Sequence, residues 1–577
     1  MLKNLFRIFE ILKKREKITF FIISFFTVLA TLLEMISLGS IPIYVSFILE
    51  PDKISNYLSS FKSLVFINEF SKEDILVFLS VTLVFIFILK SLFLAFFHYF
   101  NGLFLRKLNS RISKEIYNNY LYSDYLFYTT KTSAEFTRNI AEVSRFVGLI
   151  GHYIRLNLEL LILFFIILAT IKIDPFITII ALFIFGLFSL IYLGFIKNWL
   201  TSAGKNMQSF TKFQINLINQ TFSAIKEIKI NLKENYLFDL FSKNILKINR
   251  IVLITDLLRR FPKLILEVTA VIFVVLISLY FIIFKSSNAE LISVLSYIAV
   301  ATIRLVPAFT GITAATSSIK YMEPSINIIQ SETMLVKNLK LESIKNSEAI
   351  KVNKNLFSLN EIKINKLNFS YNENLKIIDN LDLVVKKNQK IGIVGLSGMG
   401  KTTLFNLMLG LIKANQGDIF YEKFNIKEDR YKIYNSIGYV PQDTILFNDT
   451  FKNNITFDEK DINYQKLKKI CEIVKIEDFI LNLKDGLDTK LGERGINISG
   501  GQKQRIGLAR VLYKDPSILF LDESTSSLDL DTENDILKNL FLYCKEKIIV
   551  FISHRSETLR YCDIVYKLKN GKLIKND

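Results

Sequence analysis

The first 325 residues alternate long apolar runs with polar, charged segments. A helix needs about 20 apolar residues to cross about 30 Å of hydrocarbon. Six runs come close to or exceed that length, and they lie at residues 18–49, 75–105, 156–173, 175–196, 264–284 and 291–315. The pattern therefore predicts a helical membrane domain with six spans over residues 1–325.

A different pattern follows, in which short apolar runs typical of buried strands alternate with helical periodicity. Residues 326–359 are polar and rich in Lys and Asn, which indicates a linker. Residues 360–577 then form a second domain of alternating strands and helices, which predicts an α/β fold. The expected fold class is a membrane α-helical domain fused to an α/β domain.

Lys and Arg set the expected orientation of the spans. The first 17 residues carry six basic side chains, whereas the connection at 50–74 leans acidic. By the positive-inside rule, both termini and the α/β domain are cytoplasmic. The long basic connections at 106–155 and 197–263 are then cytoplasmic too, and their helical periodicity predicts continuous extensions of the spans. Their tips either stay solvated or dock on the α/β domain.

Composition narrows the expected partners. The formal charge is +19, half of the residues are apolar and the mean hydropathy is +0.32. A basic chain can bind nucleic acid, but the long apolar runs favour lipid headgroups, so no nucleic-acid partner is expected. The three cysteines, Cys471, Cys544 and Cys562, show no CxxC spacing and are expected to be buried, reduced thiols.

A phosphate-binding loop opens the α/β domain. KIGIV (390–394) has the pattern of a buried strand, GLSGMGKT (395–402) follows, and an apolar helix comes next. This is a Walker A loop, whose glycines let backbone N–H groups point at phosphates. Lys401 would reach the β- and γ-phosphates and Thr402 would ligate Mg²⁺. ATP and Mg²⁺ are thus the expected cofactors, with ATP contacts from Gly395, Ser397, Gly398, Gly400, Lys401, Thr402 and Thr403.

Two carboxylates end a second apolar run, ILFLDE (518–523). A buried strand that delivers acids at its carboxyl end has the pattern of a Walker B strand. Asp522 would hold Mg²⁺ through water. Glu523 would polarise the attacking water as a general base.

Residues 498–505 read ISGGQKQR and lie between these two motifs. This run resembles the signature of ATP-binding cassette (ABC) proteins, and residues 360–577 are similar to an ABC ATPase domain throughout. The resemblance implies that the signature acts on ATP held by the opposite cassette. Two chains, expected to be a homodimer, would then form two working sites.

The same resemblance gives roles to further residues in family order. It implies that an aromatic stacks on adenine, a Q-loop glutamine contacts Mg²⁺ and water, a D-loop aspartate joins the dimer contact, and a switch histidine contacts the γ-phosphate and takes part in catalysis with Lys401 and Glu523. The positions that match are Tyr371, Gln442, Asp529 and His554, and the signature itself supplies Ser499, Gly500, Gly501 and Gln502.

Six spans fused to one cassette resemble the ABC exporter half-transporters, the type that includes lipid A flippases and multidrug exporters. LLEMISLGSIPIYVSFI (32–48) and IRLVPAF (303–309) are also similar to segments of bacterial flippases for lipid-linked oligosaccharides. The resemblance implies a bacterial inner-membrane protein that flips a lipid-linked saccharide or another anionic glycolipid. Alternating access driven by ATP would move the cargo.

Charged side chains within the spans offer candidate cargo contacts, because an ionisable group in the membrane is costly. Lys90 lies in the second span and Arg304 in the sixth, while Glu34 and Glu267 lie in the first and fifth. Either they form interhelical ion pairs and reach the interface, or Lys90 and Arg304 line a basic cavity for an anionic headgroup.

Two other functions are compatible with the motifs. One is export of amphipathic drugs, lipids or peptides, although a basic cavity disfavours cationic drugs. The other is an ATP-gated channel or regulator, a class that often lacks a catalytic carboxylate; Glu523 is present here.

Overall fold

The computed structural model describes residues 2–49, 72–171, 175–284, 288–334, 358–371, 376–457, 459–491, 498–553 and 555–576. The chain divides into two compact units. Unit 1 comprises Met1–Ser123 and Thr130–Leu339, and unit 2 comprises Asp124–Thr129 and Lys340–Asp577. The short segment Asp124–Thr129 therefore groups with the C-terminal part of the chain, far from it in sequence.

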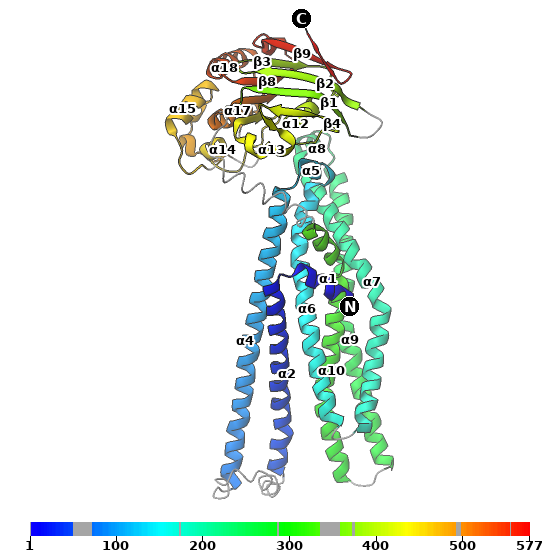
Figure 1. The fold of residues 1–577 in the computed structure, drawn as a ribbon. Helices are drawn as coiled ribbons and strands as arrows, with labels where there is room; N and C mark the ends of the chain where they lie inside the picture. The colour runs from blue at the N-terminus through cyan, green and yellow to red at the C-terminus, as the bar shows by residue number, and fades with distance from the viewer. Residues whose placement is uncertain are drawn as a thin grey trace. The chain divides into compact units, whose positions relative to one another are not determined.

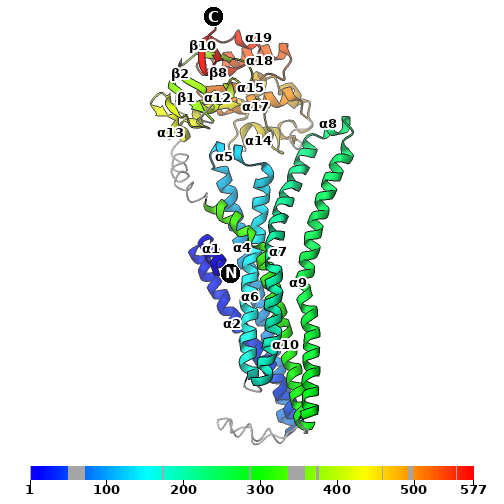
Figure 2. The same cartoon turned by 90° about the vertical axis from the view of Figure 1, so that its right-hand side faces the viewer.

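Unit 1 is built from long helices that run side by side (Figures 1 and 2). Its helices are α1 (Leu2–Ile11), α2 (Lys14–Leu49), α4 (Lys72–Leu121), α6 (Ser133–Ile171), α7 (Pro175–Ser223), α8 (Ile225–Ile230), α9 (Glu234–Phe284) and α10 (Asn288–Met322). The short helix α5 (Tyr125–Thr130) lies mostly in the segment that belongs to unit 2.

Four helical stretches among the described residues are long and apolar enough to cross a membrane, namely Lys14–Ile41, Leu76–Leu121, Ser133–Ile171 and Thr178–Ser223. They correspond to the first four predicted spans. The fifth and sixth, 264–284 and 291–315, fall in α9 and α10, where many of the side chains lie outside the described part of the chain. The count of six spans therefore stays a prediction.

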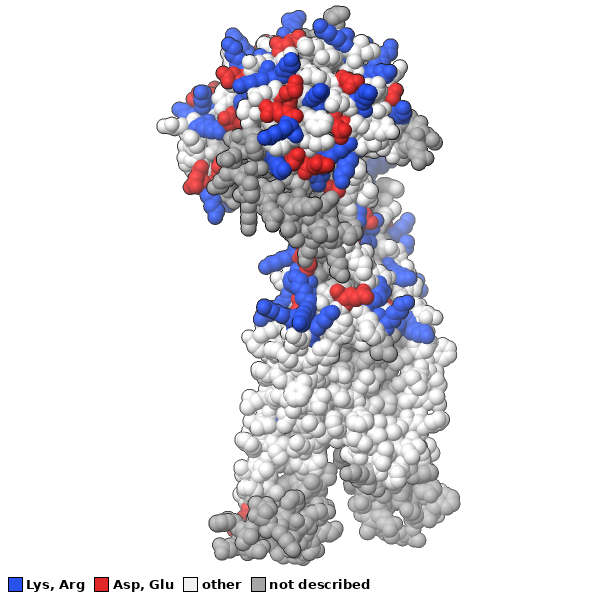
Figure 3. Space-filling view, viewed as in Figure 1, with Lys and Arg blue, Asp and Glu red and all other residues white. Residues whose placement is uncertain are grey.

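Charge is distributed along unit 1 as a membrane domain requires. In Figure 3 the face of the helices is free of charged side chains over much of its length, and Lys and Arg gather toward one end. Such a basic band suits the headgroup level of a bilayer.

Aromatic side chains fill the interior between α7, α9 and α10. Phe185 is fully buried, and its ring lies 6.2 Å from that of Phe273 and 5.8 Å from that of Phe309. Pro262 and Pro307 are accommodated inside α9 and α10 without ending either helix.

The two long basic connections are almost wholly helical, as expected. α4 continues to Leu121 before α6 begins at Ser133, and α7 continues to Ser223 before α9 begins at Glu234. The helices thus extend well past the predicted spans, and only short segments join them.

The predicted linker at 326–359 differs from the structure at its start. Residues 324–334 are helical, and Ile326 and Ile329 are completely buried in unit 1. Arg7 of α1 donates to Gln330 and Asn327 at 2.7 Å. Ile326 and Ile329 have the three-residue spacing of an apolar helix face, but the polar composition of the segment favoured a linker instead.

Unit 2 contains two sheets. The strands of the first, in spatial order, are β2 (Lys376–Lys386), β1 (Glu361–Ser370), β4 (Gln416–Tyr421) and β5 (Phe424–Asn425), and those of the second are β10 (Lys572–Lys575), β9 (Ile564–Lys569), β3 (Lys390–Val394), β8 (Ile548–Ile552), β7 (Ile518–Asp522) and β6 (Ile437–Val440). The first sheet is antiparallel, whereas β9, β3, β8, β7 and β6 run parallel.

The helices of unit 2 connect and cover these strands. They are α12 (Lys401–Met408), α13 (Ile426–Ile433), α14 (Phe451–Thr456), α15 (Tyr464–Ile473), α16 (Glu477–Leu481), α17 (Gly500–Lys514), α18 (Leu530–Tyr543) and α19 (Ser556–Leu559), with short 3₁₀ turns at Tyr434–Ser436 and Gly486–Asp488.

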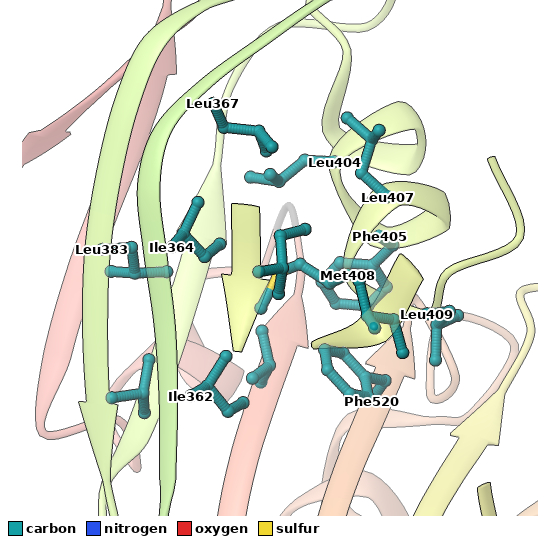
Figure 4. Packing of buried hydrophobic residues seen from close by; sticks show 14 of the residues in the cluster. Ile362, Ile364, Leu367, Leu383, Leu404, Phe405, Leu407, Met408, Leu409 and Phe520 are labelled. Carbon is teal, nitrogen blue, oxygen red and sulfur yellow. The ribbon is translucent and has the colours of Figure 1, made fainter. Parts of the chain in front are cut away.

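Helix α12 lies between the two sheets and joins their cores. Figure 4 shows Leu404, Phe405 and Met408 of α12 packed among side chains of β1 and β2 on one side and Phe520 of β7 on the other. Phe405 and Phe520 meet edge to face at 5.3 Å. This packing fixes the N-terminus of α12, where the phosphate-binding loop ends, relative to the parallel strands.

The cysteines match their prediction as free thiols. Cys471 and Cys544 are buried and Cys562 is partly buried. Burial raises the pKa of the three thiols to about 12, 11 and 12 respectively.

Candidate functional site

The loop between β3 and α12 has the conformation that a phosphate-binding loop needs. Gly398 and Gly400 adopt φ angles of +81° and +94°, which other L-residues rarely adopt. A Cβ on Gly400 would lie 2.5 Å from Ile377 Cγ2, and one on Gly395 would lie 2.9 Å from the Leu568 carbonyl oxygen. The backbone therefore approaches its neighbours too closely for side chains at these positions.

Lys401 is the first residue of α12 and is 7% exposed. Its ammonium donates to the carbonyl oxygens of Gly395 at 2.8 Å and Leu396 at 3.1 Å, so the side chain folds back over the loop. Burial lowers the pKa of Lys401, and the carboxylates of Glu523 and Asp522 oppose that shift. The loop lysine and the two acids are therefore close enough to interact.

Asp522 ends β7, a strand whose five residues are all buried. Burial raises the pKa of Asp522, the adjacent Glu523 carboxylate raises it further, and a hydrogen bond with Tyr439 of β6 lowers it. The carboxyl ends of parallel strands meet at one edge of a sheet, which is why β3 and β7 deliver their motifs to the same place.

Glu523 follows directly with a left-handed φ of +46°. Its backbone N–H donates to the Ile552 carbonyl of β8 at 3.0 Å, which fixes this unusual backbone. Gln442 donates from Nε2 to Glu523 Oε2 at 2.9 Å. The predicted Q-loop glutamine and general base are thus in direct contact.

The remaining residues predicted for the loop and adenine lie around it. Tyr371 is half exposed, and its hydroxyl lies 3.4 Å from Thr403 Oγ1. Ser397 and Thr402 are exposed at the surface of the loop. An exposed ring beside the phosphate loop is available for stacking.

The signature occupies the N-terminus of α17. Ser499 caps this helix: its hydroxyl accepts from Gln502 N at 3.2 Å, and Gln502 Oε1 accepts from Ser499 N at 2.8 Å. This is a capping box. Added Cβ atoms on Gly500 and Gly501 would lie 3.4 Å and 3.0 Å from side chains of the D-loop at residues 526–529. The signature glycines therefore allow close packing on that loop.

Asp529 caps α18 by accepting from Thr532 N at 3.0 Å, and this hydrogen bond lowers the pKa of its carboxyl. The preceding D-loop is bound by Gln504, which was not predicted as functional. Gln504 is 3% exposed, donates to Ser526 Oγ at 3.1 Å and accepts from Ser527 N at 2.9 Å. Its amide also approaches the Glu523 carbonyl oxygen at 3.5 Å.

His554 lies outside the described residues, but its neighbour Arg555 is described. Arg555 donates to the carbonyl oxygens of Ser526 at 2.6 Å and Leu528 at 3.1 Å, and it forms an ion pair with Glu533. Glu533 is fully buried and also accepts from the hydroxyls of Thr525 and Thr558. The residue after the predicted switch histidine therefore holds the D-loop.

Sequence reasoning missed Tyr439, Gln504, Glu533 and Arg555 as parts of this site. Gln504 and Arg555 stand inside the runs ISGGQKQR and ISHR, so their motifs were the available signal. Tyr439 stands in the run YVPQD (439–443) around Gln442, so its motif was a signal too. Glu533 lies outside the motifs, and nothing in its local sequence points to the contacts that it makes.

Asp124, the residue directly before α5, makes a polar contact within unit 2. Arg430 of α13 donates to Asp124 at 2.8 Å, and its guanidinium lies 4.8 Å from the centre of the Tyr431 ring. This ion pair links the segment Asp124–Thr129 to α13 within unit 2.

The residues at the sheet edge fit ATP with Mg²⁺. Among the described residues there is no group of three or more His, Cys, Asp or Glu that could hold a metal ion. Mg²⁺ needs less, because it is usually bound by one or two carboxylates together with phosphates and waters. Asp522, Gln442 and the Thr402 hydroxyl would supply the protein ligands.

Of the two predicted cargo contacts in unit 1, the structure describes the side chain of Lys90 but not that of Arg304. Lys90 Nζ lies 3.9 Å from Glu34 Oε1 and 5.5 Å from the centre of the Phe87 ring. The interhelical ion pair considered from the sequence is therefore formed. The Arg304 side chain lies outside the described residues.

Comparisons with known proteins support the motifs of unit 2. Residues 378–526 match the family model described as ABC transporter. A putative multidrug export ATP-binding/permease protein of Staphylococcus aureus is 38% identical over 215 residues, which cover 37% of each chain. A putative export ATP-binding/permease protein of Rickettsia typhi is 38% identical over 231 residues, 39% of this chain and 40% of the relative. The similarity thus spans well under half of these relatives.

A solved structure described as a bacterial Atm1-family ABC exporter with ATP bound resembles the whole chain. The TM-score is 0.73, with 18% identity over 95% of this chain and 93% of that one. The likeness extends over both units and shows a shared fold, a helical membrane domain followed by an ATPase domain.

Proposed function

We propose that this chain, which has the ABC exporter fold and carries an ABC transporter domain, couples ATP hydrolysis to transport across a membrane. The observation that carries the proposal is the meeting of Lys401, Asp522, Glu523 and Gln442 at one edge of the parallel sheet. A nucleotide-binding domain without turnover would not need a carboxylate in contact with a Q-loop glutamine.

Each residue has a role that its position supports. Lys401 leaves the carbonyls of Gly395 and Leu396 and neutralises phosphate charge. Glu523 accepts a proton from the attacking water, which Gln442 helps to orient. Asp522 and Thr402 would hold Mg²⁺, which would supply charge stabilisation at the phosphates. His554 contacts the γ-phosphate in this proposal.

The partner is a second copy of the chain. Ser499, Gly500 and Gly501 stand at a helix N-terminus, where backbone N–H groups and the helix dipole favour an anion. In the proposed homodimer this anion is the phosphate of ATP on the opposite cassette, while Tyr371 stacks on the adenine of its own. Two equal sites result, because each motif residue is present in both chains.

The cargo is proposed in two forms. The first is a lipid-linked saccharide or another anionic glycolipid, which the protein flips across the bacterial inner membrane. Lys90 and Arg304 are the cargo contacts that the sequence predicts. Export of amphipathic drugs, lipids or peptides is the second, and the name of the Staphylococcus aureus relative, a putative multidrug export protein, favours it. Both forms place the ATPase unit in the cytoplasm.

The decisive experiment measures ATP binding and turnover in the purified full-length chain. Glu523→Gln should keep ATP binding and lower turnover by about 10²- to 10⁴-fold, the range of general-base catalysis. Glu546→Gln, at a side chain 83% exposed, is the matched control and should behave as the wild type. Turnover of Glu523→Gln at the wild-type rate would refute the assignment.

A further inference from the structure

Unit 1 contains an open cavity of about 1130 Å³ that is lined by residues of α2, α4, α6, α9 and α10. Four cationic side chains line it against two carboxylates: Arg155, Arg259, Arg260 and Lys263, with Glu34 and Glu159. None of these four cations is among the cargo contacts predicted from the sequence, which were Lys90 and Arg304.

The two carboxylates are already engaged by cations of the protein. Glu159 Oε1 lies 3.7 Å from Arg155 Nε, and Glu34 Oε1 lies 3.9 Å from Lys90 Nζ. Glu159 also packs against α10, because a Cβ on Gly311 would come within 2.3 Å of its carboxyl group. These acids therefore offer little to a cationic ligand.

Arg259 is the cation with unmet hydrogen-bonding capacity. Its Nε and Nη2 atoms are buried and have no acceptor among the described residues. Its Nη1 lies 3.6 Å from Asp256, and the guanidinium lies 5.2 Å from the centre of the Tyr321 ring. A buried donor without an acceptor costs free energy, so such groups in native proteins call for a partner.

The other cations stand close to Arg259 along α9. Arg260 is its neighbour and Lys263 lies one helical turn further on. Lys263 Nζ is 3.7 Å from Glu267, a pair that is more than half exposed on both sides and therefore weak. Planar guanidinium groups recognise the oxygens of phosphate with two hydrogen bonds each.

The rest of the lining is apolar. Phe97, Leu158 and Ile162 belong to it, and the predicted fifth span begins at residue 264, directly after the cationic turn of α9. The volume slightly exceeds the 300–1,000 Å³ of typical small-molecule sites. A ligand that suits this lining has one anionic end and one apolar end.

We infer that this cavity binds an amphiphile with a phosphate headgroup, held by Arg259, Arg260 and Lys263 while its hydrocarbon chain lies along α4 and α6. The inference rests on the proposed function, since it names the class of cargo for that transporter. It favours anionic lipids over cationic drugs within the two forms of cargo.

The test uses the full-length Glu523→Gln chain in a non-ionic detergent, so that binding is measured without turnover. The probe is lysophosphatidic acid with a fluorescent acyl chain, and fluorescence polarisation reports its Kd. Dodecyl phosphate should displace the probe, whereas inorganic phosphate and dodecyltrimethylammonium at the same concentration should not. Displacement by inorganic phosphate would make free phosphate the ligand, and displacement by the cation would refute charge selection; either result overturns the inference.

Substitutions locate the site. Arg259→Gln should weaken probe binding by about tenfold to a hundredfold, the loss of a charge-assisted hydrogen bond. Arg259→Lys should lose less, and Arg250→Gln, at an exposed arginine of α9 outside the cavity, should change nothing. If Arg259→Gln does not fold, Arg260→Gln and Lys263→Gln must each weaken binding. Unchanged affinity in these variants would overturn the inference.

Failure of the inference and failure of the proposed function give different results. Absence of ATP turnover in the wild-type chain refutes the function and leaves the measured lipid affinity in place. Glu523-dependent turnover together with unaltered probe binding in the cavity variants refutes the anionic site alone.

Discussion

The buried ion pair between Glu533 and Arg555 gives the sharpest stability prediction for unit 2. Glu533 is fully buried and accepts from Thr525 Oγ1 at 2.6 Å and Thr558 Oγ1 at 2.9 Å in addition to its ion pair. Glu533→Gln keeps the shape of the side chain but removes its charge. The new amide N–H groups then face the hydroxyl and guanidinium donors that the carboxylate accepted from. In this variant Arg555, whose side chain is a third exposed, loses its carboxylate partner.

Breaking such a pair from one side costs about 3–5 kcal/mol, and we expect the lower end because Arg555 can reach water. For a unit of this size, about 3 kcal/mol corresponds to a fall in Tm of about 6–12 °C. Glu546→Gln is the matched control, since Glu546 is 83% exposed and lies 3.9 Å from Lys387. Its Tm should shift by less than about 2 °C.

The assay can follow unit 2 by itself. The only tryptophan, Trp199, lies in unit 1, whereas all three cysteines lie in unit 2. A fluorogenic maleimide therefore reports the unfolding of unit 2 in the detergent-purified chain as the buried thiols become reactive.

A double-mutant cycle checks the cause of the loss. If Glu533 and Arg555 stabilise each other, the Glu533→Gln/Arg555→Gln double variant should lose much less than the sum of the single variants. A Tm for Glu533→Gln equal to that of Glu546→Gln, or strict additivity in the cycle, would refute the reasoning.

Three further predictions concern the loop, the thiols and α5. Gly400→Ala should weaken binding of a fluorescent ATP analogue by about tenfold or more, because strain adds to a contact of 2.5 Å with Ile377; Gly398→Ala, with strain alone, should lose less, and equal losses would contradict this account. Burial raises the pKa of Cys544 to about 11, so iodoacetamide should leave it unmodified at pH 8 unless the chain is denatured, and the stability from the protonated thiol should be lost as pH rises from about 9 toward 11. Arg430→Gln removes the 2.8 Å contact to Asp124 and should speed amide hydrogen exchange in α5 but not elsewhere in unit 2; unchanged exchange would show that the contact does not hold α5.

Periodicity and local motifs were sufficient for the architecture. The apolar runs gave the long helices, since length and composition alone decide whether a helix can span a membrane. The phosphate loop and the end of β7 were predictable because each depends on consecutive residues in a strand–loop–helix or strand–acid context. Residues 326–334 were assigned to the linker but are helical, because a few buried apolar side chains outweigh a polar composition.

The contacts that position the proposed catalytic groups could not be predicted in the same way. Tyr439 reaches Asp522 from a neighbouring strand, and Gln504 reaches the D-loop across more than 20 residues of sequence. Such partners are set by tertiary packing. A motif can mark Gln504 or Tyr439 as a candidate, but it does not show which group the side chain contacts. The ion pair between Lys90 and Glu34 was likewise only one of two interpretations of the sequence, because it depends on how the helices pack.

Two long side chains hold the D-loop from different elements, and this has a consequence for how the proposed dimer works. Gln504 of α17 binds Ser526 and Ser527, and Arg555 binds the carbonyls of Ser526 and Leu528. The signature helix, the D-loop and the segment after β8 are therefore constrained to move together. Gln504 Nε2 also lies 3.5 Å from the carbonyl oxygen of Glu523. The backbone N–H of Glu523 in turn donates to the Ile552 carbonyl of β8. In the proposed dimer, closure of the signature on the partner's ATP would reach Glu523, the proposed general base of the same chain, through the buried Gln504 amide. Such a connection would couple the two proposed sites.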